Sequence, residues 1–260
     1  MRDVSHRLPA SRPTRVQVLV TCLVDRIFPD TGMSVVAVLE RLGLTVECPA
    51  AQTCCGQPAF NAGALDEARA LGRHTIDILS HSDAPIVIPS GSCGDMVIHQ
   101  YETIFAAEPA YLDKARAIAA RTYEFSEFLV DVMGVTDVKA ATTEKLTYHA
   151  CCHGLRGLDL ARQPRALVAG ISGAAICPMA EDEVCCGFGG LFAVKMPDIS
   201  SAMLDRKLDR IQESGANTVV VTDVSCAMHM AGGLHRRGSS VRVRHLADVL
   251  AETASTRTRA

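Results

Sequence analysis

The chain contains no tryptophan, and only 4% of its 260 residues are aromatic. Proteins that bind single-stranded nucleic acid stack the bases on exposed aromatic side chains, and this composition argues against such a platform. The 26 basic and 29 acidic side chains nearly balance, whereas a nucleic-acid-binding domain would carry a basic excess. No apolar run approaches the roughly 18 residues of a membrane span. We therefore expect neither a nucleic-acid partner nor a transmembrane helix.

The N-terminal segment does not have the features of a secretory signal. Residues 1–15 carry four arginines and two prolines, and no small-residue cleavage site follows the apolar segment that begins at Val16. We interpret residues 1–15 as a disordered tail and expect the chain to be cytoplasmic. A reducing compartment disfavours structural disulfides, and the odd number of 11 cysteines fits a fully paired framework poorly. The cysteines therefore indicate metal or redox chemistry.

The cysteines follow a pattern that occurs twice. In each copy, a single cysteine precedes a Cys-Cys-Gly triplet by 32 or 33 residues, and a further cysteine follows 39 or 41 residues after the first cysteine of the triplet. The two sets are Cys22, Cys54, Cys55 and Cys93, and Cys152, Cys185, Cys186 and Cys226. Because the spacings recur to within two residues, we infer a duplication with a period of about 130 residues, too long for a solenoid repeat.

Each copy alternates β-branched segments with amphipathic ones, which is typical of βαβ units around a parallel sheet. Strands are expected at 16–20, 44–48, 86–88, 145–149, 174–177 and 218–221. Helices are expected at 31–42, 66–79, about 109–121, 128–132, 163–169, 197–212 and 246–250, and from about Cys93 and Cys226. The predicted fold class is α/β, with two tandem Rossmann-like domains at 16–136 and 145–252, each with a mainly parallel sheet, and a short tail at 253–260.

The predicted fold brings the cysteines of each copy together. In an open parallel sheet, the loops after the strands share one edge, and ligands bind there. The cysteines follow the strands of their own copy, so we expect one site of four thiols in each domain. Cys93 and Cys226 are expected at helix starts, where free N–H groups and the helix dipole stabilise thiolates.

The Cys-Cys-Gly triplets require a turn. Adjacent side chains of an extended segment point to opposite faces, so Cys54 and Cys55 reach one centre only if the chain bends. Gly56 allows that bend because glycine adopts positive φ at little cost. The second loop has Gly187, Gly189 and Gly190 in the corresponding place. We expect these glycines to shape the cofactor-binding loops.

Four thiolates in one site suit either zinc or an iron–sulfur cluster. Structural zinc sites usually contain two Cys-x-x-Cys pairs, and this sequence has none. An iron–sulfur cluster is larger and can be held by cysteines on several loops. The pattern favours iron–sulfur chemistry, while zinc and a redox dithiol stay open as alternatives.

The repeated spacing resembles the cysteine-rich CCG domain, which also occurs in heterodisulfide reductase and in the iron–sulfur subunits of glycolate oxidase and anaerobic glycerol-3-phosphate dehydrogenase. The phrases around the cysteines resemble the lactate utilisation protein A (LutA/YkgE) family over about residues 16–250. These phrases are Val20 to Asp25, Gln52 to Ala59, Pro89 to Cys93 and Val184 to Gly190.

The resemblance implies an iron–sulfur oxidoreductase subunit of a complex that oxidises L-lactate to pyruvate. It implies one or two [4Fe–4S] clusters on the eight matched cysteines, with electron relay through them. The implied partners are a ferredoxin-like iron–sulfur protein, a third protein of the lactate utilisation system and a small 2-hydroxy acid. The alternatives are a zinc-bound or thiol-only assembly module and a subunit of a glycolate or heterodisulfide-type oxidoreductase.

The sequence departs from its relatives at one position in each copy. The heterodisulfide reductase motif ends in Cys-x-x-Cys, whereas Met96 and His229 occupy the last position here. Each copy thus lacks a fifth cysteine, which favours clusters with four cysteine ligands. We interpret His229 as a histidine on a helix surface, with a replacement ligand as the alternative.

Three cysteines lie outside the matched sets. Cys48 and Cys177 end strands and are interpreted as small core residues. Cys151, next to the matched Cys152, is interpreted as a neighbour without a role, with a spare ligand as the alternative.

The residues around the second site include candidates for catalysis. His149 and His153 flank the site, and His153 is the better candidate for proton transfer because imidazole titrates near neutrality. Arg156 and Lys195 are the candidates to face an anionic substrate, although either can be a surface charge.

Overall fold

The computed structural model describes residues 8–254. Residues 1–7 of the expected N-terminal tail and 255–260 of the expected C-terminal tail therefore lie outside the described residues, and the first strand already begins at Arg15. None of the helices within 8–254 has the length and apolarity that a membrane span requires.

The first half of the chain is built on a parallel sheet with the strand order β2-β1-β3-β4. The strands are β1 (Arg15–Val18), β2 (Thr45–Glu47), β3 (Ile86–Ile88) and β4 (Thr122–Glu124). The helices between them are α1 (Cys22–Ile27), α2 (Pro29–Arg41), α3 (Gln57–Asn61), α4 (Leu65–Leu79), α5 (Gly91–Asp95), α6 (Tyr101–Ile104) and α7 (Pro109–Ala119), with a π-helical turn η2 (Met96–Gln100). The half ends with α8 (Phe125–Glu127) and the π-helical turn η3 (Phe128–Val132).

The second half repeats this arrangement with the order β6-β5-β7-β8. The strands are β5 (Lys145–Tyr148), β6 (Ala175–Ile176), β7 (Thr218–Val221) and β8 (Arg242–His245). The helical segments are the π-helical turn η4 (His153–Gly157), α9 (Arg162–Ala169), α10 (Leu191–Lys195), α11 (Pro197–Glu213), α12 (Val224–Arg236) and α13 (Leu246–Ala251). Since both sheets are parallel and have the same order, the predicted α/β fold class is confirmed.

Most of the predicted elements are present with small shifts of their ends. Strands β3 and β7 have the predicted bounds, and the extra helix of the first copy is α7. The fourth strand of each sheet, β4 or β8, is not predicted by the sequence pattern. Strand β4 is only three residues long, and β8 alternates arginine with valine and histidine, so neither contains a continuous apolar segment. Both are edge strands that pair with the central β3 or β7.

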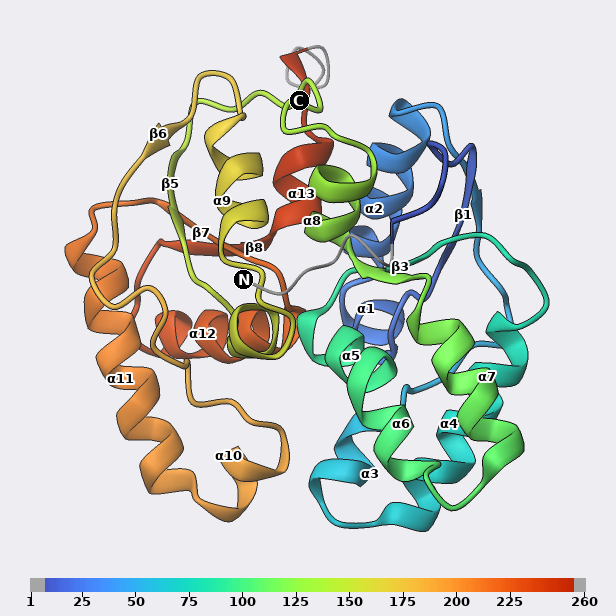
Figure 1. Cartoon of the computed structure of the whole chain (residues 1–260). Coiled ribbons are helices and arrows are strands. Elements are labelled where there is room, and N and C mark those ends of the chain that lie inside the picture. The colour runs from blue at the N-terminus through green and yellow to red at the C-terminus, as the bar shows by residue number, and fades with distance from the viewer. Residues whose placement is uncertain (1–7, 255–260) are drawn as a thin grey trace.

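The two halves share one core. Figure 1 shows α9, α13, α8 and α2 between the sheets of the second and first halves. Val35 and Leu39 of α2 belong to the same buried cluster as Val249 and Leu250 of α13. At the end of α2, the Arg41 guanidinium donates hydrogen bonds to the carbonyl oxygens of Val138, Leu250 and Ala251 at 3.0, 2.9 and 2.5 Å. The duplicated units are therefore packed against each other through a common layer of helices.

Each half also has an outer apolar cluster. In the first half, residues of α4, α6 and α7 cover the other face of the sheet. In the second half, α11 and α12 do the same. Helices thus lie on both faces of each sheet, which is why the central strands β3 and β7 are buried along their whole length.

Candidate metal centre

The cysteines of the first set lie where the predicted fold places them. Cys22 begins α1 directly after β1, and Cys54 and Cys55 lie in the loop between β2 and α3. Cys93 lies in the first turn of α5, where its N–H donates to the Ser90 side chain at 3.3 Å. The Sγ atoms of the buried Cys55 and Cys93 are 3.3 Å apart, while Cys22 and Cys54 are half-buried.

The turn after the paired cysteines depends on glycine, as predicted. Gly56 has a φ of +89°, and its N–H donates to Cys54 Sγ at 3.5 Å. In the second half, Gly187 has the same φ, and its N–H donates to Cys185 Sγ at 3.4 Å. A Cβ atom on Gly187 would lie 2.7 Å from the Ser200 carbonyl oxygen, so a larger residue is excluded by both backbone conformation and space.

The second set has the same arrangement. Cys152 precedes η4, and Cys185 and Cys186 lie in the loop before α10. Cys226 lies in the first turn of α12, so both predicted helix-start cysteines are found there. Cys186 and Cys226 are buried, and Cys152 and Cys185 are half-buried.

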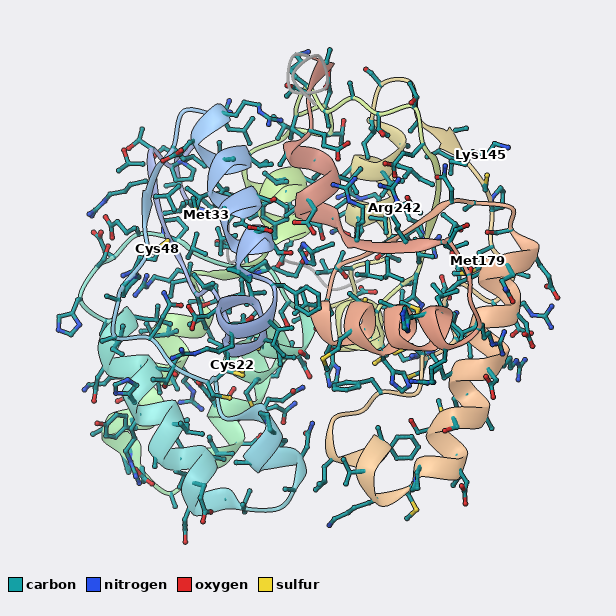
Figure 2. The ribbon with its side chains drawn as sticks, turned by 180° about the vertical axis from the view of Figure 1, so that it is seen from behind. Cys22, Met33, Cys48, Lys145, Met179 and Arg242 are labelled. Carbon is teal, nitrogen blue, oxygen red and sulfur yellow. The ribbon has the colours of Figure 1, made fainter. Side chains whose placement is uncertain are left out.

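Both sets line the same cavity, which has a volume of about 250 Å³ and lies between the halves. This differs from the expectation of one separate site in each domain. The reason is the common helical layer, which turns the cysteine-bearing edges of the two sheets toward each other. In the view of Figure 2, Cys22 lies at the inner side of the first half, whereas Cys48 lies toward its outer edge.

One thiol in each set is held as a thiolate. Hydrogen bonds from Cys22 and Cys55 lower the pKa of Cys54 to about 3. Hydrogen bonds from Cys152 and Cys186 lower the pKa of Cys185 to about 2. A thiolate that accepts several hydrogen bonds is stabilised against protonation, and the thiolate is the form that binds metals. Each set thus provides a preformed anionic sulfur at neutral pH.

Asp223 connects the two sets. Its Oδ2 atom accepts hydrogen bonds from Ser90 Oγ at 2.9 Å and from the Ser92 N–H at 3.0 Å, both in the first half. Its Oδ1 atom accepts from the Ser225 N–H at 3.0 Å and from Ser225 Oγ at 2.6 Å, at the start of α12. Burial by itself raises the pKa of Asp223, but the hydrogen bonds from Ser225 and Ser92 lower it overall. A buried carboxylate therefore bridges the helices that carry Cys93 and Cys226.

The structure adds two residues to the second site. Cys151 is 2% exposed and lines the cavity, and its ligand atom lies within 4.8 Å of those of Cys226 and His149. His149 is fully buried, and burial followed by the charge of Lys207 lowers its pKa to about 3. The interpretation of Cys151 as a neighbour without a role misses this contact. The His-x-Cys spacing directly after a strand is the sequence feature that could have identified this pair, because residues two apart in an extended segment share a face.

The candidates for proton transfer and anion binding separate in the structure. His153 lines the cavity, with its Nε2 atom 3.3 Å from Gln57 Nε2 and its Nδ1 atom 3.7 Å from Cys152 Sγ. Arg156 donates to the Glu183 carbonyl oxygen at 2.9 Å, and Lys195 is exposed on α10. No lysine or arginine among residues 8–254 lines the cavity. Neither of the predicted anion-binding side chains is therefore brought to the cysteines.

The last motif positions are occupied by residues that lie outside the cavity lining. Met96 is fully buried in the core of the first half. His229 is half-buried on α12, and its ring centroid lies 5.6 Å from that of Phe188; its interpretation as a helix-surface histidine stays a prediction. Cys48 is exposed because it follows the edge strand β2, so its interpretation as a core residue is wrong. Cys177 is half-buried.

The donor chemistry of the cavity fits an iron–sulfur cluster. Its sulfur donors are the eight matched cysteines and Cys151. Asp223, the one carboxylate that the described part of the chain brings to the lining, already accepts four hydrogen bonds. Gly189 and Gly190 line the cavity and have φ values of +51° and +60°, which lets the second loop curve around it. Sulfur-rich sites of this kind select iron–sulfur clusters, zinc or copper over hard cations.

Comparison with known proteins assigns both halves to one domain family. The CCG family, described as a cysteine-rich domain, matches residues 16–98 and 146–231. A solute-binding protein of an ABC transporter from R. palustris, solved in complex with 4-hydroxybenzoate, aligns with 90% of this chain and 61% of its own at 12% identity. The TM-score of this alignment is 0.24.

Similar chains occur in several bacteria under the name lactate utilization protein A. The protein from Exiguobacterium sp. is 44% identical over 91% of this chain and 97% of its own length. The protein from Shouchella clausii is 41% identical over 90% and 98%, and that from Halalkalibacterium halodurans is 40% identical over 94% and 99%. At this identity over nearly the whole length, the chain belongs to the lactate utilization protein A family and carries two cysteine-rich CCG domains.

Proposed function

We propose that the chain is an iron–sulfur subunit of a system that oxidises L-lactate to pyruvate, and that it relays electrons through its two cysteine sets. The observation that carries the proposal is the shared cavity lined by eight matched thiols from both halves. Iron–sulfur clusters are held by cysteine thiolates, and one thiolate in each set is already stabilised. The relationship to proteins named for lactate utilization supports the choice of substrate system.

The proposed ligands are the four cysteines of each set. These are Cys22, Cys54, Cys55 and Cys93 in the first half, and Cys152, Cys185, Cys186 and Cys226 in the second. One or two [4Fe–4S] clusters held there would supply one-electron transfer. The chain itself keeps four of these thiols buried, and the N–H groups of Gly56 and Gly187 point at cysteine sulfur. N–H groups directed at sulfur stabilise the negative charge of a reduced centre.

The lining favours electron relay over lactate binding by this chain. A carboxylate substrate is usually recognised by arginine or lysine, and none from residues 8–254 reaches the cavity. We therefore propose that lactate is oxidised on a partner and that this chain accepts or delivers electrons. The proposed partners are a ferredoxin-like iron–sulfur protein and a third protein of the same system.

Anaerobic purification with iron and sulfide counting tests the proposal. An iron–sulfur chain is brown and gives an electron paramagnetic resonance signal after reduction or oxidation. Cys55→Ser and Cys186→Ser are a matched pair, one buried thiol in each half, and Cys48→Ser is the control at an exposed position. With one cluster on each set, each of the paired substitutions removes about half of the iron; with a single cluster, each removes all or none of it; the control removes none. A colourless chain that contains zinc would contradict the proposal.

A further inference from the structure

A second donor group lies at the end of β5, beside the matched cysteines of the second half. The ligand atoms of His149, Cys151 and Cys226 all lie within 4.8 Å of one another. The three residues are 0%, 2% and 6% exposed. We propose that His149, Cys151 and Cys226 form a nitrogen–sulfur site for a thiophilic divalent cation such as Fe²⁺ or Zn²⁺, and that the described residues of the first half form no such site. Cys226 and its neighbour Cys186 also belong to the second cysteine set, so a cation at this site and a cluster on that set are alternative occupants of these thiols; the inference rests on the proposed function to that extent.

The imidazole of His149 has an unused nitrogen. Its Nδ1 atom lies 3.2 Å from the Asp182 carbonyl oxygen, to which Nδ1–H donates, and its buried Nε2 atom has no hydrogen-bond partner among residues 8–254. A buried polar atom without a partner costs about 1–3 kcal/mol, so natural proteins rarely retain one without a reason. Metal-binding histidines commonly donate the other ring N–H to a backbone carbonyl, which fixes the tautomer and presents the free lone pair to the metal. The hydrogen bonding of His149 is that of a metal ligand.

The carbonyl group that orients His149 is itself fixed. Lys207, 1% exposed, donates from Nζ to the Glu181 carbonyl oxygen at 2.5 Å and approaches that of Asp182 at 3.4 Å. The Ala150 N–H donates to the same Asp182 oxygen at 3.1 Å. These contacts hold the carbonyl oxygen that accepts from the imidazole in one place, so the position of the ring is fixed. Burying a lysine is costly, and this lysine is used to hold the loop beside the proposed site.

The duplication provides an internal comparison. The matched cysteines Cys22 and Cys152 are 130 residues apart, and the same offset relates His149 and Cys151 to Leu19 and Thr21. Leu19 and Thr21 are also buried, but neither is a ligand for a thiophilic metal. Helix α4, the counterpart of the helix that carries Lys207, buries no charged side chain. The ligand residues and the lysine therefore occur together in one half only, as a dedicated site requires.

The second copy lacks a fifth cysteine at the end of its motif, and the proposed site supplies a fifth thiol from another position. His229, at the position where related motifs have a cysteine, lies against Phe188 and outside the cavity lining. Cys151 instead supplies an additional thiol from the strand end, close to Cys226. A tetrahedral cation takes four ligands, and Cys186, within hydrogen-bond reach of Cys226, is available as the fourth.

Cobalt binding tests the site separately from iron–sulfur assembly. The variant Cys22→Ser/Cys54→Ser/Cys152→Ser/Cys185→Ser removes the half-buried thiols of both sets and keeps His149, Cys151 and Cys226. The reduced full-length variant is titrated with Co²⁺ alone without oxygen, and we expect one Co²⁺ per chain with the visible absorption of tetrahedral thiolate coordination. Adding Cys151→Ser or His149→Gln should weaken Co²⁺ binding by more than about 100-fold. That is more than the loss expected for a residue that only hydrogen-bonds to a metal ligand. Adding Cys177→Ser, as a control, should change nothing.

The outcomes separate this inference from the proposed function. Absence of Co²⁺ uptake by the fourfold variant, or uptake that is insensitive to both His149→Gln and Cys151→Ser, would overturn the site. This holds even if the wild-type chain is brown and contains an iron–sulfur cluster. A wild-type chain without iron would refute the iron–sulfur function while leaving the cobalt result intact. If circular dichroism shows that the fourfold variant is unfolded, Cys151→Ser and Cys177→Ser are compared with the wild type as reduced, iron-free full-length chains titrated with Co²⁺. Loss of one tightly bound Co²⁺ in Cys151→Ser alone supports the site, and equal uptake by both variants contradicts it.

Discussion

The buried carboxylate of Asp223 should contribute strongly to the stability of the chain, because it joins the two halves beside the cavity. It accepts two hydrogen bonds from its own helix start at Ser225 and two from Ser90 and Ser92 of the other half. In the first half the corresponding position is Ser90, whose Oγ atom caps α5 by accepting from the Cys93 N–H and donates to Asp223 in the other half. Asp223→Ala removes both functions, and Asp223→Ser retains the local cap while removing the bridge.

The expected magnitudes follow from the hydrogen bonds that each substitution removes. A hydrogen bond to a charged group contributes about 1.5–3 kcal/mol. Loss of an N-cap costs about 1 kcal/mol. Taking the lower figure for the two bonds between the halves, Asp223→Ser should lower the free energy of unfolding by about 3 kcal/mol and Asp223→Ala by about 4 kcal/mol.

Urea unfolding of the reduced, metal-free chain at neutral pH, followed by circular dichroism, measures both values. A double-mutant cycle of Asp223→Ser with Ser90→Ala isolates the bond between the halves, since a coupled pair loses less in the double variant than the two single losses predict. If Asp223→Ser is within about 0.5 kcal/mol of the wild type, the bridge does not hold the halves together and the reasoning is refuted.

Three further predictions concern burial, backbone conformation and thiol acidity. Burial raises the pKa of Glu124 to about 7 from 4.5, so this group destabilises the folded state progressively as the pH rises through that interval, by up to about 3 kcal/mol. Glu124→Gln should therefore be more stable than the wild type in urea unfolding at about pH 8 but not at about pH 4. An equal stability difference at both pH values would contradict the raised pKa. Gly187→Ala should lower the free energy of unfolding by about 2 kcal/mol more than Gly134→Ala does, because both glycines have positive φ but only Gly187 has a carbonyl oxygen within 2.7 Å of the new Cβ. Equal melting temperatures of the two variants would contradict the steric argument. In the metal-free chain at about pH 5, an alkylating reagent should label Cys54 before the exposed Cys48, because partial desolvation and the charge of Glu40 raise the pKa of Cys48. Mass spectrometry of the peptides measures the order, and the reverse order would contradict the thiolate assignment.

Local patterns in the sequence are sufficient for the central parts of the fold. Strands β3 and β7 are continuous β-branched segments, and their bounds agree with the prediction because a short segment of this kind rarely forms anything other than a buried strand. The helix-start positions of Cys93 and Cys226 and the positive φ of Gly56 are likewise predictable from their neighbours. Strands β4 and β8 are not, because β4 is only three residues long and β8 alternates arginine with valine and histidine, so their pairing depends on the sheet beside them.

Burial of the surplus cysteines cannot be predicted in the same way. Cys48 and Cys177 occupy corresponding strand ends, yet the first is exposed and the second half-buried. The spacing pattern gives Cys151 no role, but in the structure its ligand atom lies within 4.8 Å of those of His149 and Cys226. Whether a thiol at a strand end faces solvent or a cavity depends on what packs over that end, which no neighbouring residue specifies.

The sequence by itself determined the duplication, the alternation of the first three strands of each copy with helices, and the edge of each sheet at which the cysteines gather. These properties follow from spacing along the chain, because periodicity and turns are local. Only the tertiary structure decided that the two cysteine-bearing edges face each other across one cavity. That orientation depends on the packing of α2 against α13, exemplified by the 3.1 Å hydrogen bond from Thr31 to Asp248, between residues 217 positions apart. Contacts over such distances in sequence are set by the shapes of whole surfaces, and they convert two similar units into one shared site.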